Sequence, residues 1–211
     1  MKYKFVTGLH GNEPIPVIAL AQMGVEQYVA NPKALSENKR FIDLDLNKAF
    51  GVDGVGYEIQ RAKEILKDIK DSEIVVDLHT FSAESDPFAI VVEKDMLDLA
   101  MQAGVPHIVI MEHNIKNGHA FINYRKGISV EVGKHDSFDS FKNSQKVYLS
   151  LNEKKEKRDN KNKPNIFRVI GIISEPGKYR NFKKTDQGFY PVLAGEKAYD
   201  FYGLKAVKVE I

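Results

Sequence analysis

The sequence of 211 residues contains no cysteine. This absence excludes disulfide scaffolds, thiolate zinc sites and cysteine nucleophiles, so any zinc must be bound by histidine and carboxylate side chains. The chain also lacks an excess of either charge, because its formal net charge is only +2. Bulk electrostatics therefore give no reason to expect nucleic acid or an acidic membrane surface as a partner.

Long apolar runs are absent as well. No segment approaches the roughly 20 residues that a membrane-spanning helix needs, and the N-terminus enters the first predicted strand without the apolar stretch of a signal peptide. We therefore expect a cytoplasmic protein with no membrane partner. Hydrophobic residues make up 43% of the chain and charged residues 28%, which is typical of a globular protein that can bury a sizeable core.

Predicted strands and helices alternate along most of the chain. The pattern predicts strands at residues 3–6, 25–29, 73–79, 87–92, 105–111 and 127–133, and helices at residues 15–23, 57–70, 94–103 and 137–152. This alternation predicts an α/β fold with a mixed central sheet flanked by helices. After a run of mixed charge, short β-like runs follow at residues 166–173, 188–193 and 204–211. We therefore divide the chain into a main domain, residues 1–152, and a small β-rich C-terminal subdomain, residues 153–211.

A turn after the first predicted strand carries His10 and Glu13. The turn begins at Gly8, and Pro14 opens the helix-compatible run that follows. Open α/β sheets keep their sites at the carboxyl ends of strands, where this turn lies. Zinc accepts imidazole nitrogen and carboxylate oxygen, and a catalytic zinc takes three protein ligands. The turn offers two of the three, although such a pair also occurs in loops that bind no metal.

The β-branched run at residues 73–79 ends on His79, which offers the third ligand. His10, Glu13 and His79 together make the ligand set of a catalytic zinc site with one open position. Asp77 lies two residues before His79, on the same face of the strand. Its carboxylate either holds the imidazole in the correct tautomer or pairs with a nearby lysine.

Two further segments carry polar side chains suited to catalysis. Glu131 interrupts an apolar strand and is the candidate general base, because a carboxylate near a zinc site can take a proton from water and pass it to a leaving amine. Residues 40–50 combine apolar anchors with Arg40, Asn47 and Lys48. An arginine and a lysine can clamp a substrate carboxylate, and Arg40 can polarise the scissile carbonyl. The alternatives are an ion-pair role for Glu131 and a solvated Lys48.

Several of these segments, in the same order along the chain, resemble the succinylglutamate desuccinylase/aspartoacylase family, which is related to zinc carboxypeptidases. The matching segments are residues 8–13, 31–34, 40–50, 77–79, 131–133 and 190–199. The resemblance implies a zinc carboxypeptidase-like fold and one Zn2+ per chain. It also implies a zinc-dependent deacylase that hydrolyses the amide bond of a small-molecule N-acyl amino acid, succinylglutamate-like or acetylaspartate-like, to a carboxylate and a free amino acid.

The resemblance also implies roles for individual residues. His10, Glu13 and His79 correspond to the zinc ligands, which makes residues 1–152 a zinc-hydrolase catalytic domain. Glu131 corresponds to the general acid and base, and Arg40 to the group that stabilises the oxyanion.

Substrate contacts follow in the same way. Asn47 corresponds to a residue that helps hold the substrate, and Tyr199 to a substrate contact from the C-terminal subdomain, with core packing as its alternative. Lys48 stands where the family usually has arginine, so a bidentate carboxylate clamp is lost there. Arg125 is the nearest candidate for a second substrate-binding arginine.

Other functions stay open at this point. The chain is alternatively a small zinc carboxypeptidase, or a non-catalytic ligand-binding protein that kept the fold. The retention of all four residues His10, Glu13, His79 and Glu131 argues against the second alternative. The sequence does not fix the acyl group, the amino acid or the oligomeric state, so a homo-oligomer stays open. Another divalent ion that accepts the same ligands is the alternative to zinc.

Overall fold

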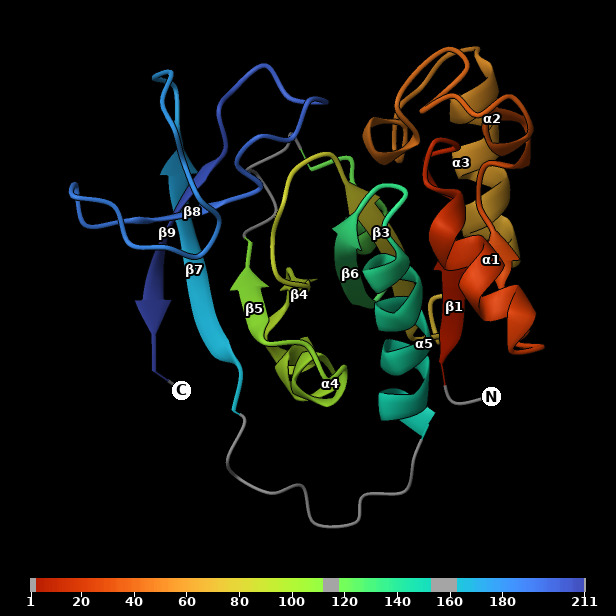
Figure 1. Cartoon of the computed structure of the whole chain (residues 1–211). Helices are drawn as coiled ribbons and strands as arrows, with labels where there is room; N and C mark the ends of the chain where they lie inside the picture. The colour runs from red at the N-terminus through yellow and green to blue at the C-terminus, as the bar shows by residue number, and fades with distance from the viewer. Residues whose placement is uncertain (1–2, 112–117, 153–162, 211) are drawn as a thin grey trace.

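A computed structural model of the chain describes residues 3–111, 118–152 and 163–210 (Figure 1). These residues build one sheet from nine strands: β1 (Lys4–Thr7), β2 (Tyr28–Val29), β3 (Val75–Phe81), β4 (Phe88–Val91), β5 (His107–Ile110), β6 (Gly127–Lys134), β7 (Asn165–Ile172), β8 (Tyr190–Val192) and β9 (Leu204–Val209). The α-helices are α1 (Pro14–Gln22), α2 (Pro32–Ser36), α3 (Tyr57–Asp68), α4 (Leu97–Gln102) and α5 (Phe138–Asn152). Short 3-10 helices are η1 (Leu46–Lys48), η2 (Lys94–Met96) and η4 (Phe121–Asn123).

The sheet has the order β2-β1-β3-β6-β4-β5-β7-β9-β8. β1 pairs in parallel with β2 and β3, and β3 pairs in parallel with β6. β4 is antiparallel to β6 but parallel to β5, which in turn is parallel to β7. β9 is antiparallel to both β7 and β8. The predicted α/β fold with a mixed central sheet flanked by helices is therefore confirmed.

The C-terminal segment is rich in strands, as predicted, but its strands extend the main sheet. β7 is hydrogen-bonded to β5, with Val109 opposite Phe167, and one hydrophobic cluster contains both of these side chains. The predicted domain boundary adjoins residues 153–162, which lie outside the described residues, and the division into two domains stays a prediction. Within the described residues, the sheet and its core continue across that boundary.

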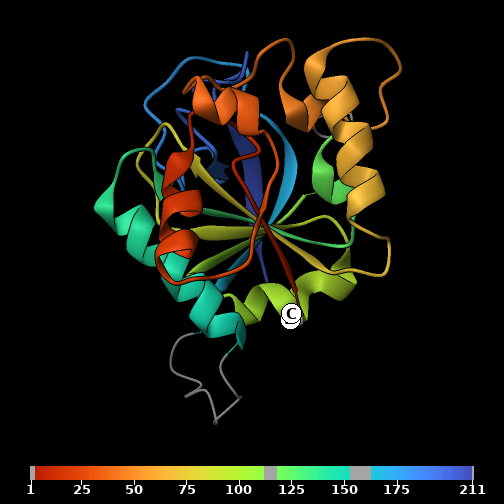
Figure 2. The same ribbon diagram turned by 90° about the vertical axis from the view of Figure 1, so that its right-hand side faces the viewer.

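Helices cover both faces of the sheet (Figure 2). Side chains alternate between the two faces along each strand, so Phe5 and Val6 of β1 enter different hydrophobic clusters. Phe5 packs with Leu20 of α1 and Val147 of α5 on one face, and α4 covers the same face. Val6 packs with Ile65 of α3 on the other. The amphipathic pattern of the predicted helix at residues 57–70 directs this apolar stripe onto the sheet.

The face that α3 covers has a polar gap near its middle. Val75 of β3 belongs to the cluster under α3, whereas Phe81 of the same strand belongs to the cluster around β7 and β9. Between these two residues, on the same face of β3, lie Asp77 and His79. β6 pairs with β3 and sets Glu131 opposite His79. The two hydrophobic clusters therefore leave room for a polar pocket above β3 and β6.

Two local features differ from the predicted elements. Asn31 and Pro32, a turn signal in the sequence, begin the five-residue helix α2, where the Asn31 side chain accepts a hydrogen bond from the Ala34 amide at 3.2 Å. The helix expected at residues 94–103 consists of η2 followed by α4. Across the described part of the chain, every helix is too short or too polar to cross a membrane.

Candidate active site

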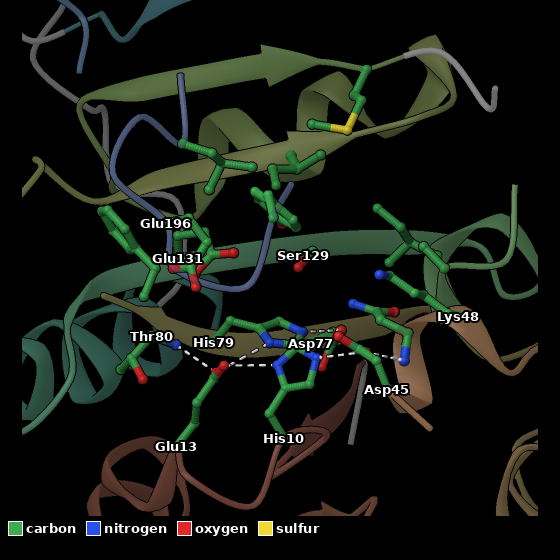
Figure 3. A pocket seen from close by; sticks show the side chains of 18 of the residues that line it. His10, Glu13, Asp45, Lys48, Asp77, His79, Thr80, Ser129, Glu131 and Glu196 are labelled. Carbon is green, nitrogen blue, oxygen red and sulfur yellow. Dashed lines mark hydrogen bonds and ion pairs between the residues drawn. The ribbon is translucent and has the colours of Figure 1, made fainter. Parts of the chain in front are cut away.

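Three buried side chains converge at the carboxyl ends of β1 and β3. Candidate ligand atoms of His10, Glu13 and His79 all lie within 4.8 Å of one another. Oε1 of Glu13 lies 2.7 Å from Nδ1 of His10, and Oε2 lies 3.2 Å from Nδ1 of His79. The Thr80 amide donates a 2.8 Å hydrogen bond to the same Oε2 atom, which fixes the carboxylate between the two rings (Figure 3).

The turn that carries His10 and Glu13 depends on tight backbone packing. Gly8 follows β1 with a φ of 60°, a left-handed conformation that glycine adopts without strain. The Glu13 amide donates to the His10 carbonyl at 3.2 Å, and α1 begins immediately afterwards at Pro14. The Gly11 amide donates to the Arg40 carbonyl at 3.1 Å, which joins this turn to the Arg40 segment. The start of α1 and the contact with the Arg40 segment thus hold the turn that carries His10 and Glu13.

A second carboxylate lies behind each imidazole. Oδ2 of Asp77 lies 2.7 Å from Nε2 of His79, and Oδ1 of Asp45 lies 3.1 Å from Nε2 of His10. The carboxylate at Nε2 of His79 favours the tautomer whose Nδ1 atom carries a lone pair, whereas Nε2 of His10 also has Nη2 of Arg40, a donor, at 3.1 Å. Both Nδ1 atoms and the Glu13 carboxylate then face one another, which is the nitrogen and oxygen donor set that zinc accepts. The residues present therefore fit a zinc ion.

The charges of this cluster shift the pKa values of its members in a consistent way. Burial by itself lowers the pKa of His79, but Asp77 and Glu13 outweigh burial and raise that pKa well above its usual value. Burial is likewise outweighed at His10, whose pKa Glu13 and Asp45 raise. The two imidazoles in turn hold the pKa of Glu13 below its usual range against the effect of burial. The Glu13 carboxylate is therefore ionised at neutral pH.

Arg40 lies beside this cluster with its guanidinium in the pocket. Its Nε donates to Oδ2 of Asp45 at 3.1 Å, and its Nη1 lies 3.6 Å from Oε1 of Glu13. Asp45 also caps η1 by accepting a 2.9 Å hydrogen bond from the Asn47 amide. One carboxylate therefore orients Arg40, the His10 ring and the start of the segment with Asn47 and Lys48.

Asn47 and Lys48 form one end of the pocket. Oδ1 of Asn47 accepts a 2.9 Å hydrogen bond from the Phe121 amide, which fixes the orientation of the side-chain amide. Because Oδ1 is the acceptor in this hydrogen bond, the Nδ2 group of Asn47 is the donor end of the side chain. Lys48 lines the same pocket and is exposed to solvent at the rim. This end of the pocket therefore offers hydrogen-bond donors and one positive charge.

Glu131 reaches the pocket from β6. It is buried, and the register of β6 against β3 sets it opposite His79. Figure 3 shows its carboxylate across from the His10, Glu13 and His79 group. Tyr199 lines the same pocket, and burial and the nearby Glu131 both raise the pKa of its hydroxyl, which keeps Tyr199 a hydrogen-bond donor at neutral pH.

The structure brings nearly all sequence-predicted site residues around this single pocket: His10, Glu13, Arg40, Asn47, Lys48, Asp77, His79, Glu131 and Tyr199. Arg125 is elsewhere. Its guanidinium donates to the backbone carbonyls of Leu66, Ile69 and Tyr124 and pairs with Asp71 at 2.7 Å. Arg125 therefore stabilises the end of α3 and is unavailable as a substrate ligand.

Two lining carboxylates were not predicted as site residues. Asp45 lies within residues 40–50, which were predicted to carry substrate-binding side chains. Its contact with His10 forms only because this segment folds back against the His10 turn. Glu196 is buried and accepts hydrogen bonds from the Ser82 amide at 2.8 Å and the Ala198 amide at 3.1 Å. The sequence signal that could have identified Glu196 is its position within residues 190–199, the segment that also contains Tyr199 and resembles the family.

Comparisons with known proteins identify the family of this chain. Residues 4–152 match the family described as the succinylglutamate desuccinylase/aspartoacylase catalytic domain. The chain is 27% identical to a probable aspartoacylase of Prochlorococcus marinus (strain AS9601), over 61% of this chain and 52% of that protein. It is likewise 28% identical to a probable aspartoacylase of Prochlorococcus marinus subsp. pastoris, over 63% and 53%. The chain thus spans about half the length of the curated relatives it matches.

Solved structures share the fold over almost the whole chain. A succinylglutamate desuccinylase from Chromobacterium violaceum superposes with a TM-score of 0.75 and 16% identity, covering 99% of this chain and 85% of that one. Murine aminoacylase 3 gives a TM-score of 0.67 and 18% identity, with 99% and 96% covered. Since the family match extends over most of the sequence, this chain belongs to the succinylglutamate desuccinylase/aspartoacylase family.

Proposed function

We propose that this protein is a zinc-dependent hydrolase that cleaves the amide bond of an N-acyl amino acid to give a carboxylate and a free amino acid. The observation that carries the proposal is the position of Glu131 opposite the converging His10, Glu13 and His79 side chains. A general base across from a three-ligand site is the arrangement that metal-assisted hydrolysis requires.

His10, Glu13 and His79 would hold the zinc ion, and Asp45 and Asp77 would fix the two imidazoles. When bound, zinc acts as a Lewis acid that polarises a carbonyl oxygen and makes a nearby water more acidic. Glu131 takes the proton of the attacking water on a carboxylate oxygen. It then delivers this proton to the amide nitrogen as the carbon–nitrogen bond breaks, so that the amine leaves neutral.

The remaining lining residues bind and orient the substrate. Arg40 donates a hydrogen bond to the carbonyl oxygen as negative charge develops on it. Nδ2 of Asn47 and Nζ of Lys48 hold the carboxylate of the amino acid. The Tyr199 hydroxyl is a further donor at the same pocket. In this proposal Arg40 contacts the carbonyl oxygen of a small N-acyl amino acid, and Asn47 and Lys48 contact its carboxylate.

The test is the metal content of the purified protein, measured by mass spectrometry together with turnover. We expect about one zinc per chain, its loss in His79→Ala, and its retention in Glu131→Ala with turnover reduced by about 10³-fold. A panel of N-acyl amino acids and short peptides identifies the substrate. Cleavage of peptides alone would favour a carboxypeptidase.

Two results would overturn the proposal. A protein that is purified without metal and refuses added zinc cannot use the proposed reaction, and a non-catalytic binding function would then be the better interpretation. Loss of zinc in Glu131→Ala would make Glu131 a ligand or a determinant of the fold instead of the general base.

A further inference from the structure

The pocket has two chemically different walls. The wall that carries the zinc ligands is polar, and it is built by the turn after β1, by β3 and β6, and by the segment with Arg40. The opposite wall is formed by five apolar side chains, which we call the apolar wall: Ile90, Val92, Met111, Ile122 and Leu193. Figure 3 shows apolar side chains on the strands that face His10 and His79 across the pocket.

The apolar wall is part of a packed core. Ile90 and Met111 are only 5% and 7% exposed, and Leu193 is 1% exposed. All three belong to the hydrophobic cluster that includes Val109 and Phe167, so their side chains are supported from behind. A wall of this kind binds apolar groups by removing their surface from water, and it offers no hydrogen bond to a polar group.

The described part of the pocket lining carries little positive charge. Among the described residues that line the pocket, the basic side chains are Arg40 and Lys48. Arg40 is already paired with Asp45 and Glu13. Lys48 and Asn47 can therefore bind one substrate carboxylate at their end of the pocket. Glu131 and Glu196 also line the pocket, so a second substrate carboxylate would meet negative charge and apolar surface.

Three more basic side chains lie close by but line a different hollow. Lys178, Arg180 and Lys197 surround a neighbouring hollow that shares Glu196 and Tyr199 with the pocket. They are absent from the lining of the pocket that contains His10 and His79. A small acidic substrate seated against the zinc ligands therefore gains nothing from these charges through direct contact.

We propose that the substrate is an N-acyl amino acid with a single carboxylate and one apolar substituent of about four carbons that packs on the apolar wall. This inference rests on the proposed function and narrows it. Substrates with two or three carboxylates, such as acetylaspartate or succinylglutamate, fit the pocket poorly. The apolar substituent belongs either to the side chain of the amino acid or to the acyl group, and the experiment separates these two sources.

The experiment compares pairs of substrates that match in shape and differ in charge. N-acetyl-leucine is compared with N-acetylaspartate, and N-(4-methylpentanoyl)glycine with N-succinylglycine. We expect the apolar member of at least one pair to have a kcat/KM about 100-fold higher, because the acidic member must bury an unpaired carboxylate. The first pair tests the amino-acid side chain, and the second tests the acyl group.

The possible results have distinct meanings. Equal rates, or preference for the acidic member in both pairs, would overturn the inference while the proposed hydrolase stands. If the protein prefers the acidic member in both pairs and Arg180→Ala removes this preference, the inference is overturned and the neighbouring hollow supplies the charge. Failure to hydrolyse any of the four compounds or the wider panel would count against the hydrolase itself.

A variant of the apolar wall provides a second test. Ile122 is half-buried in η4, where a longer side chain can extend along the pocket. Ile122→Lys should reduce the preference for the apolar member by at least about tenfold by adding a cation to the wall. The matched control is Ile172→Lys, because Ile172 is 48% exposed on β7 and does not line the pocket. The control should keep the wild-type preference.

A binding measurement makes the test independent of turnover and of the folding of Ile122→Lys. Calorimetry on the zinc-loaded Glu131→Gln protein gives the Kd of each compound without hydrolysis. We expect N-acetyl-leucine or N-(4-methylpentanoyl)glycine to bind at least about tenfold more tightly than its acidic counterpart. Tighter binding of the acidic compounds would overturn the inference.

Discussion

Oδ2 of Asp77 lies 2.7 Å from Nε2 of His79, and this contact determines which nitrogen of the ring faces Glu13. Both residues are buried on the same face of β3, where the two-residue repeat of a strand sets them side by side. The alternative that the sequence left open was a pairing of Asp77 with a lysine, but in the structure Asp77 pairs with His79. Asp77 is therefore in position to orient a metal ligand.

Asp77→Asn should weaken zinc binding by about 10–100-fold, because the amide holds the ring with less electrostatic support. The apparent Kd is measured by competition with a chromophoric chelator. Asp139→Asn is the control, since Asp139 is an exposed residue of α5 whose ion pair with Lys142 is at the surface. An unchanged zinc affinity in Asp77→Asn would show that the His79 ring is positioned without this carboxylate.

Gly11 lies against the backbone of α2, which leaves no space for a side chain at this position. A Cβ atom added at Gly11 would come within 2.0 Å of the Ala34 carbonyl carbon and 2.3 Å of the Leu35 nitrogen. Backbone atoms cannot yield as side chains do. Gly11→Ala should therefore lower the free energy of unfolding by about 3 kcal/mol and weaken zinc binding through the displaced turn.

The control for this prediction is Gly171→Ala. A Cβ atom at Gly171 would meet nothing within 4 Å. Urea unfolding measures both variants, and only Gly11→Ala should be strongly destabilised. Comparable stability of the two variants would mean that the turn and α2 separate at little cost, so that Gly11 is not what fixes the position of His10.

The sequence predicted the elements of the fold well, because hydrophobic periodicity is a local property. It also predicted which side chains gather at the site, since His10, His79 and Glu131 each stand out against an apolar strand or its end. It could not predict that Asp45 contacts His10, because this contact depends on how the segment after Arg40 folds back over 35 residues of chain. The position of Glu196 likewise depends on a distant contact, the hydrogen bond from the Ser82 amide, which is 114 residues away along the chain.

Arg125 illustrates the opposite error, since a candidate substrate ligand is a structural residue. Its guanidinium donates to the carbonyls of Leu66 and Ile69, which the end of α3 leaves without helical partners. Arg125→Ala should lower the free energy of unfolding by about 2 kcal/mol. The KM of the zinc-loaded enzyme should stay within about twofold of wild type.

Lys126→Ala is the matched control for Arg125→Ala. Lys126 is the adjacent basic residue, and its ion pair with Asp95 is at the surface. Its loss should leave the free energy of unfolding close to that of wild type, because a solvent-exposed ion pair contributes little to stability. A large rise in KM with unchanged stability in Arg125→Ala would instead return Arg125 to the substrate site.

Glu58 organises the segment that carries the substrate-binding residues. Its buried carboxylate accepts hydrogen bonds from three successive backbone amides, those of Ile42 at 2.7 Å, Asp43 at 2.9 Å and Leu44 at 3.1 Å. The Asn31 side chain donates a fourth at 3.2 Å. Glu58 thus fixes the shape of the chain between Arg40 and Lys48, and we assign it the role of a positioning residue.

This arrangement predicts an acid-sensitive contribution to stability. Burial by itself raises the pKa of Glu58, but the hydrogen bonds from Ile42, Asp43 and Leu44 outweigh burial and lower that pKa. The unfolded chain therefore binds this proton more readily than the folded chain. The stabilisation from Glu58 is complete above about pH 4.3, the usual glutamate pKa, and is lost as the pH falls through the lowered value.

Glu58→Gln should lower the free energy of unfolding at pH 7 by about 2 kcal/mol, because the amide group sets N–H donors against backbone N–H donors. The variant should also lose less stability than wild type between about pH 5 and pH 3, since it lacks the titrating group. Urea unfolding across this range measures both effects. Glu64→Gln, at an exposed position of the same helix, should behave as wild type. An equal acid dependence in wild type and Glu58→Gln would show that other carboxylates control the acid stability of the protein.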